Sequence, residues 1–286
     1  MKRMLLCLVL AAMLLTGAVA EDTKEDGVFD LLLIGTDAHD DSDTGRSDVM
    51  VLVHLDGQRE KVRLISFLRD LYVTIPGHGK NRLNAAYVYG GAELLERTLE
   101  ENFGVSPDAC AEVNFARLTE VIDAIGGVEA DVDEAERQQL NGILRHYNRA
   151  VGDAETTGLV AKAGLQLLNG RQALCYSRIR KIDDDFHRSS RQREVLEAAF
   201  RKVTSLDVLS MAALAVNHLD AVSTDLTAGD VIRLIPLALR VKDAAFESMT
   251  VPVAGAYEDR KVQGMLVLVP DKSATRQAVE DFLSGT

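Results

Sequence analysis

Short runs of valine, isoleucine and leucine mark the predicted strands of this chain. Each run is bounded by Gly, Asp or Pro, residues that favour turns, and the first two runs are apolar enough to be buried on both faces. The predicted strands are residues 28–35, 48–56, 61–68, 71–75, 110–115 and 128–132, followed near the end by 246–253 and 265–269. Strand-forming sequence is therefore concentrated in the first half of the chain.

Helical spacing alternates with these strands. Leu94, Leu95, Thr98 and Leu99 recur at the period of a helix, and Gly104 suits its C-terminal cap. Helices are predicted at residues 90–104, 116–127 and 273–283, and residues 133–240 are mostly helical in pattern. Interleaved strands and helices predict an α/β fold, a three-layer α/β/α sandwich around a mixed central sheet. With no internal repeat and no long Pro or Gly linker, residues 21–286 are predicted to form one domain.

The first twenty residues, "MKRMLLCLVLAAMLLTGAVA", have a positive start, an apolar run and a small-residue ending. This is the pattern of a secretory signal peptide, with cleavage predicted after Ala20. An N-terminal membrane anchor is the alternative, although the apolar run is shorter than the ~20 residues that usually span a bilayer. In both cases the folded part is expected outside the cytoplasmic membrane. Cys110 and Cys175 then remain, and either a disulfide or two buried free thiols fits the sequence.

The net charge of the chain limits the kinds of ligand that it is expected to bind. The formal net charge of the 286 residues is -12, which argues against a general nucleic-acid binder because such proteins carry a basic face. Yet five arginines fall within residues 178–193. Any polyanion site is therefore expected to be local.

An acidic loop separates the first two predicted strands. It contains Asp37, Asp40, Asp41, Asp43 and Asp48, together with Arg46. Carboxylates at the ends of buried strands suit a hard cation such as Mg²⁺, and Asp37 and Asp48 lie closest to the strands. The alternative is a solvated loop in which Asp and Gly serve as turn residues.

Arg69 and Asp70 stand where the third predicted strand meets the fourth. Arg69 could fork two oxygens of a phosphate beside the acidic loop, or it could form a structural ion pair with Asp70 or a loop carboxylate.

The arginine-rich stretch precedes and enters a predicted helix. A helix from about Phe186 places Arg188 and Gln192 on one face, with Arg188 in the first turn, where a cation opposes the helix dipole. An anion would relieve this, supplied either by a ligand or by the neighbouring aspartates 183–185. Arg178 and Arg180 bring more guanidinium groups than capping needs, and Arg191 and Arg193 are expected on the solvated side.

Several catalytic motifs are absent from the sequence. There is no Gly-rich phosphate loop followed by Lys, no Gly-x-Ser-x-Gly elbow and no His-Glu-x-x-His zinc motif. Acidic residues combined with several arginines indicate phosphoryl transfer, in which a metal and guanidinium groups neutralise a leaving pyrophosphate.

Four segments resemble the LytR-CpsA-Psr family of extracytoplasmic cell-wall phosphotransferases: "LLLIGTDAHDDSDTGRSDVMVLV", "ISFLRDLYVTIPGHGKNRLNAAYVYGG", "VNFARLTEVIDAIGGVEADV" and "LNGRQALCYSRIRKIDDDFHRSSRQREVL". The resemblance covers about residues 28–205. It implies transfer of a glycopolymer, such as teichoic acid or capsule, from a polyprenyl-pyrophosphate lipid at the membrane surface to a peptidoglycan acceptor. It also implies a hydrophobic pocket for the lipid tail, with "NAAYVYGGAELL" and "FARLTEVI" as wall segments.

The resemblance also implies roles for individual residues. By motif, Asp37 and Asp48 correspond to the ligands of Mg²⁺, and Asp48 or Asp185 is expected to act as base. The residues that correspond to pyrophosphate ligands are Arg46, Arg69, Arg178, Arg180, Arg188 and Gln192. The catalytic set implied in this way is Arg46, Asp48, Arg69, Asp185 and Arg188.

Two features depart from the family pattern: "SFLRD" stands where the family usually has "SIPRD", and the start of the chain looks cleavable. The alternatives to transfer are hydrolysis of the same lipid-linked glycan and a non-catalytic protein that binds polyprenyl phosphate or glycan.

Overall fold

The computed structural model describes residues 27–36, 45–207, 210, 213–214 and 222–285. The chain divides into two compact units, one formed by residues 1–114 and 222–286 and the other by residues 115–221. The predicted signal peptide lies outside the described residues. Among the residues that the structure describes, no helix is both long and apolar enough to cross a bilayer. Two compact units can fold together as one domain, so this division does not test the predicted single domain. A single domain from residue 21 onward stays a prediction.

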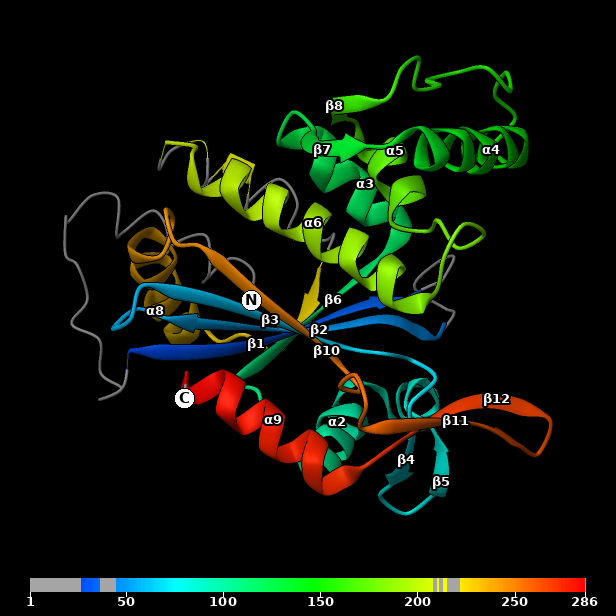
Figure 1. Cartoon of the computed structure of the whole chain (residues 1–286). Coiled ribbons are helices and arrows are strands. Elements are labelled where there is room, and N and C mark those ends of the chain that lie inside the picture. Colours follow the sequence, from blue (N-terminus) through cyan, green and yellow to red (C-terminus); the bar gives the residue numbers. More distant parts are fainter. Residues whose placement is uncertain (1–26, 37–44, 208–209, 211–212, 215–221, 286) are drawn as a thin grey trace. The chain divides into compact units, whose positions relative to one another are not determined.

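A six-stranded mixed sheet forms the centre of the first unit, in the order β10-β3-β2-β1-β6-β9 (Figure 1). β1, β2 and β3 form an antiparallel meander, β6 is parallel to β1, and β10 is parallel to β3. The strands are β1 (Val28–Thr36), β2 (Ser47–Asp56), β3 (Lys61–Phe67), β6 (Ala109–Asn114), β9 (Ser223–Thr224) and β10 (Phe246–Val251). The predicted α/β fold with a mixed sheet is confirmed.

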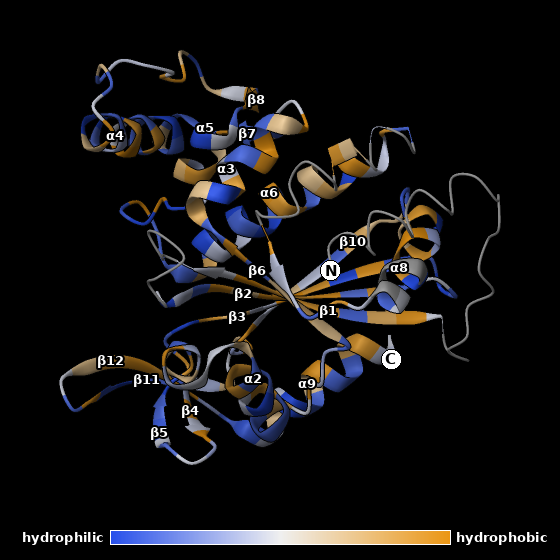
Figure 2. Ribbon diagram, turned by 180° about the vertical axis from the view of Figure 1, so that it is seen from behind, coloured by the Kyte–Doolittle hydropathy of each residue, from blue (hydrophilic) through white to orange (hydrophobic). Residues whose placement is uncertain are grey.

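Helices cover both faces of this sheet. In both views α2 (Asn84–Phe103) and α9 (Lys272–Ser284) lie on one side and α8 (Ala228–Arg240) lies on the other (Figures 1 and 2). The central strands are coloured mostly as hydrophobic in Figure 2, and every residue of β2 from Met50 to Asp56 is buried. Burial on both faces explains why β2 reads as an unbroken apolar run rather than an alternating one.

Four strands escaped sequence prediction because they carry no apolar run. β5 (Gly79–Arg82) pairs with β4 (Tyr72–Ile75), β11 (Tyr257–Val262) pairs with β12 (Met265–Pro270), and the two-residue β9 pairs with β6. The fourth, β8 (Gly164–Leu168), lies in the second unit, where sequence predicted mostly helix. These strands are short, polar or exposed, and pairing with a neighbour rather than burial defines them.

The helix predicted from residue 90 begins earlier, at Asn84. A first helical stretch is separated from the main helix by Gly90 and Gly91, whose backbones are not helical, and Gly91 has a φ of 64° that favours glycine. In the first stretch the Tyr87 side chain is buried and the Tyr89 side chain is exposed.

The second unit is mainly helical. It contains α3 (Phe115–Ala124), β7 (Val128–Val132), α4 (Glu134–Ala150), β8 (Gly164–Leu168), α5 (Gly170–Tyr176) and α6 (Asp185–Thr204). Its core gathers apolar residues from α3, the β7–β8 hairpin, α4 and α5, including Ile122, Val132, Leu140, Leu168 and Tyr176. α4 and α5 both begin with a capping box, in which a side chain and a backbone N–H pair reciprocally.

Gly170, in the "LNGRQAL" segment, packs directly against α3. A Cβ atom at this position would lie 2.1 Å from the backbone oxygen of Thr119, and the Gly170 N–H donates to Asp123 Oδ1 at 2.7 Å. We expect Gly170→Ala to lower the free energy of unfolding by about 3 kcal/mol, because backbone rather than a flexible side chain must move. Denaturation in guanidinium chloride measures this.

Gly142→Ala is the matched control. Gly142 lies within α4 and an added Cβ meets nothing within 4 Å, so we expect a gain of about 0.5–1 kcal/mol from helix propensity. Equal midpoints for the two variants would contradict the close packing of Gly170.

Candidate functional site

The first group of predicted site residues surrounds the turn that follows β3. Leu71 N–H donates to the Leu68 oxygen at 3.1 Å and closes a turn whose central residues are Arg69 and Asp70. Both leucines are buried, which anchors the turn and leaves the polar pair between them partly exposed. Apolar residues on either side of "RD" thus position the guanidinium group.

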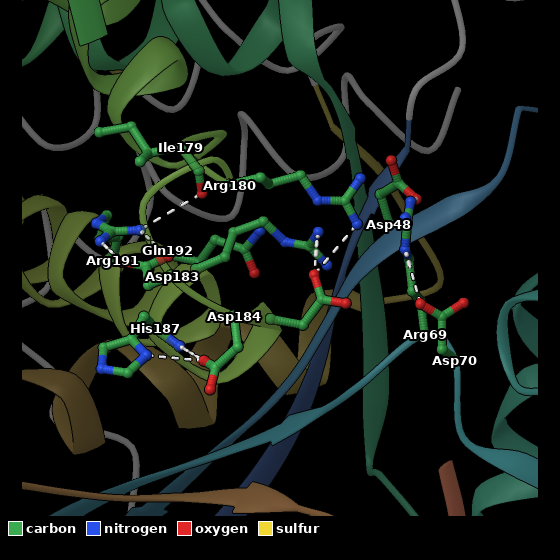
Figure 3. Close-up of polar contacts among 12 residues, drawn as sticks. Asp48, Arg69, Asp70, Ile179, Arg180, Asp183, Asp184, His187, Arg191 and Gln192 are labelled. Carbon is green, nitrogen blue, oxygen red and sulfur yellow. Dashed lines mark hydrogen bonds and ion pairs between the residues drawn. The ribbon is translucent and has the colours of Figure 1, made fainter. Parts of the chain in front are cut away.

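Arg69 is held by two carboxylates. It donates to Asp48 Oδ1 at 2.6 Å, and its Nε lies 3.6 Å from Asp70 Oδ2 (Figure 3). Asp70 in turn accepts from Arg82 at 2.8 Å. The side chain of Asp48 is 25% exposed and that of Arg69 is 20% exposed. The ion pair predicted as the structural alternative for Arg69 is present, and it includes one of the proposed metal ligands.

The acidic loop is only partly described. Asp37, Asp40, Asp41 and Asp43 lie outside the described residues, and Arg46 is exposed just before β2. Of the two predicted Mg²⁺ ligands, Asp37 and Asp48, the structure therefore describes only Asp48.

The "SFLRD" departure has a structural explanation. Leu68 stands where the family pattern has proline, and its N–H donates to the Val251 oxygen at 2.9 Å. Proline has no N–H to donate, so leucine adds one hydrogen bond that continues the β3–β10 pairing. Phe67 meanwhile stacks on Phe103, with 5.6 Å between ring centroids.

The second group of predicted residues lies where the segment after α5 enters α6. Asp184 caps the helix by accepting from the His187 N–H at 3.0 Å, and α6 begins at Asp185. Asp185 Oδ1 forms an ion pair with Arg188 at 2.5 Å and accepts from Arg180 at 3.1 Å. One carboxylate oxygen is thus shared by two guanidinium groups.

Two further predicted residues lie on the flanking elements. Arg178 is exposed and its guanidinium lies 5.1 Å from the ring centroid of Phe115, a cation–π contact. The Gln192 amide contacts the Ser177 oxygen at a long 3.4 Å. Within the second unit, the structure therefore brings Arg180, Asp185 and Arg188 together and places Arg178 and Gln192 beside that segment.

Burial changes the picture of three arginines. Only 6% of Arg188 is accessible. Arg191 was expected on the solvated side of α6 and is only 5% accessible, because it pairs with Glu136 and Asp183. Burial lowers the pKa of Arg191, but hydrogen bonds to Asp183 and Glu136 outweigh it, and the pKa is raised overall. Arg193 is partly buried, and desolvation lowers its pKa.

Sequence reasoning gave Arg191 and Glu136 no role. The one sequence signal was the position of Glu136 three residues after Asp133, a capping box that fixes the glutamate at the start of α4. Nothing in the spacing of Glu136 and Arg191 indicates that they meet, since 55 residues separate them.

Both cysteines are free and buried. Burial raises the pKa of the Cys175 thiol to about 12 and also raises that of Cys110, where neighbouring carboxylates add to the effect. The open question of a disulfide is thus answered in favour of two free thiols.

Glu96, Cys110 and Asp225 form a group of ligating atoms that lie within 4.8 Å of one another. The Cys110 N–H donates to Asp225 Oδ1 at 2.7 Å, and burial raises the pKa of Glu96. The hydrogen bond from Cys110 ties β6 to Asp225, just after β9, and Glu96 belongs to α2.

A cavity of about 590 Å³ lies in the second unit between the β7–β8 hairpin and α6. Its walls include Glu129, Asp131, Glu194, Glu197, Arg201 and Lys202. No lining residue of this cavity belongs to the two predicted wall segments, so the cavity does not test the predicted lipid pocket, which stays a prediction.

Comparison with known proteins supports the motifs. Regulatory protein MsrR of Staphylococcus aureus is 29% identical over 268 residues, which cover 91% of this chain and 76% of that protein. The teichoic acid transferase TagT of Bacillus subtilis, named as acting between polyisoprenyl-teichoic acid and peptidoglycan, is 31% identical over 228 residues, covering 78% of this chain and 67% of TagT.

Solved structures of TagT have the same fold. TagT bound to LIIa-WTA matches with a TM-score of 0.72 and 28% identity, covering 94% of both chains. TagT with bound octaprenyl pyrophosphate lipid matches with a TM-score of 0.68 and 26% identity, covering 94% of this chain and 95% of that one. The model of the LytR_cpsA_psr family matches residues 14–282. The chain therefore belongs to the LytR_cpsA_psr family.

Proposed function

We propose that this protein transfers a glycopolymer from a polyprenyl-pyrophosphate carrier to a hydroxyl group of peptidoglycan. Family membership and the likeness to TagT support the reaction class. The signal-like residues 1–20 support action outside the cytoplasmic membrane, close to the lipid donor. Teichoic acid, capsule and other wall glycans share the same diphosphate linkage, so the proposal concerns that linkage.

The observation that carries the proposal is the sharing of Asp185 Oδ1 by Arg180 and Arg188. Two guanidinium groups converge on one oxygen of one carboxylate, which brings two positive charges to the same place at the start of α6. A diphosphate offers several oxygens and a larger charge, which suits charge-assisted, forked hydrogen bonds from arginine. Arg178, exposed beside this segment, and Gln192 are proposed to add contacts to the same anion.

The proposed transfer exchanges one phosphorus–oxygen bond for another. The acceptor hydroxyl oxygen attacks the phosphorus that carries the glycan, and the bond from that phosphorus to the bridging oxygen breaks. The bridging oxygen leaves with its electron pair as part of polyprenyl phosphate, and the hydroxyl proton passes to a carboxylate, for which Asp48 and Asp185 are the candidates. Arginines stabilise the charge that gathers on the leaving phosphate.

Asp48 fits a Mg²⁺ ligand. Its Oδ1 is engaged by Arg69, so Oδ2 is the oxygen that a cation would take, and a partly exposed carboxylate is a ligand that Mg²⁺ prefers. Asp37 is proposed as the second ligand from its motif. When bound, the ion would supply positive charge to the diphosphate oxygens.

Turnover of a polyprenyl-pyrophosphoryl glycan tests the function. We expect the purified protein with Mg²⁺ to move the glycan phosphate onto a peptidoglycan oligosaccharide, as detected by mass spectrometry of the acceptor. Release of free glycan phosphate with acceptor present would instead establish a hydrolase. Binding of the lipid without turnover would establish a carrier, and either result would contradict the transferase.

A further inference from the structure

Arg191 joins three segments of the second unit. From α6 its Nε donates to Glu136 Oε1 at 2.7 Å. Its terminal nitrogens contact both oxygens of Asp183, with Nη1 at 3.2 Å from Oδ1 (Figure 3). Nη1 also lies 3.4 Å from the Ile179 oxygen. Arg191, Glu136 and Asp183 are called the clasp below.

Both carboxylates of the clasp are held in position. Glu136 uses its other oxygen, Oε2, to accept from the Asp133 N–H at 3.0 Å, which completes the capping box of α4. Asp183 belongs to the segment between α5 and α6, whose start is anchored by the buried Ile179. The clasp therefore fixes the segment 179–183 to the start of α4 and to the first half of α6.

That segment bears on the arginines of the proposed diphosphate site. Arg180 and Arg178 lie within or beside it, whereas Arg188 is one helical turn before Arg191 on α6. The distance between Arg180 and Arg188 thus depends on how the segment is tied to α6. The side chain of their shared partner, Asp185, is 35% exposed, so it is a weaker restraint than the clasp, whose carboxylates are only 12% and 14% exposed.

Stability alone is a poor reason for such a cluster. Burying three charged groups costs desolvation, and neutral replacements of similar volume often leave stability unchanged or improve it. A rigid fork that reaches two carboxylates does, however, set the geometry of the segments that carry them.

We propose that Arg191 is a positioning residue, which through Asp183 and Glu136 holds Arg178 and Arg180 at the spacing from Arg188 that a diphosphate requires. The inference rests on the proposed function, because it concerns the same anion site.

Two variants separate positioning from simple stabilisation. Arg191→Met removes the clasp and leaves two partly buried carboxylates without their cation, so both melting temperature and anion affinity should fall. The triple variant Arg191→Met, Glu136→Gln, Asp183→Asn removes all three charges, and Gln at position 136 still completes a capping box. The probe is inorganic pyrophosphate, with its Kd measured by calorimetry at low ionic strength and the melting temperature measured on the same samples.

We expect the triple variant to recover the melting temperature of the wild type while its Kd for pyrophosphate stays about tenfold weaker, as for other losses of supporting contacts around a site. Arg201→Met, which breaks the exposed pair with Glu197 on the same helix, should leave the Kd unchanged. Arg191→Lys is a second variant that should retain the fold, because it keeps a cation at this position. Lysine cannot donate to two carboxylates in the forked geometry of arginine, so we expect this variant to bind pyrophosphate several-fold more weakly than the wild type.

The outcomes distinguish the two proposals. If the wild type binds pyrophosphate and the folded triple or lysine variant binds equally well, the positioning role of Arg191 is wrong and the proposed function stands. If the wild type itself does not bind pyrophosphate, the arginine site fails and the inference fails with it.

Discussion

Arg188→Ala is expected to lower kcat/KM for the lipid-linked donor by about 100- to 1,000-fold, the usual cost of removing one hydrogen-bond donor that stabilises charge in a transition state. Arg188 lies in the first turn of α6, is 6% accessible and contacts Asp185 at 2.5 Å. A cation in the first turn of a helix is repelled by the positive end of the helix dipole, and an anion beside the cation offsets this repulsion. The variant therefore loses charge where the leaving phosphate needs it.

Its burial means that Arg188→Ala also affects folding, and the melting temperature should fall by several degrees. Arg188→Lys separates the two effects, because lysine fills much of the same space and keeps the charge but cannot fork two oxygens. We expect this variant to melt near the wild type and still lose at least about tenfold in kcat/KM.

Arg201→Ala, at the exposed end of the same helix, is the control and should change neither quantity by much, since exposed pairs contribute little. Normal turnover by Arg188→Lys would show that a forked contact at this position is not required.

Removal of divalent metal is expected to abolish turnover, and added Mg²⁺ should restore it. The physical reason is that a diphosphate concentrates negative charge that arginines alone neutralise only in part. Titration of Mg²⁺ into chelator-treated protein, with turnover as the readout, gives the activation constant.

Asp48→Asn tests the ligand assigned to that metal. Asparagine keeps the size of the side chain and an oxygen that can accept from Arg69 but loses the charge, so we expect about 100-fold lower turnover and a higher Mg²⁺ requirement. Asp259→Asn, an exposed aspartate on β11, should behave as the wild type. Undiminished turnover in chelator would overturn both the metal and the role of Asp48.

The strands and helices that sequence located best are those whose burial leaves a periodic trace. β1, β2, β3 and α9 have nearly the predicted bounds because their apolar residues face a core. β5, β8 and β11 had no such trace, since hydrogen bonds to a neighbouring strand define them. Similarly, the kink at Gly90 and Gly91 depends on backbone angles, and sequence marked it only as a pair of glycines.

By itself the sequence determined the fold class, the family and the chemical types of the site: aspartates near buried strand ends and arginines at the start of a helix. These depend on local pattern and motif, which a linear chain displays. Tertiary structure decided which charges pair. It buried Arg188 and Arg191, turned Arg191 from an expected surface residue into the centre of a clasp with Glu136, and left the cysteines free. Pairings across long sequence separations depend on how elements pack, because desolvation and distance, not residue type, set the strength of each ion pair.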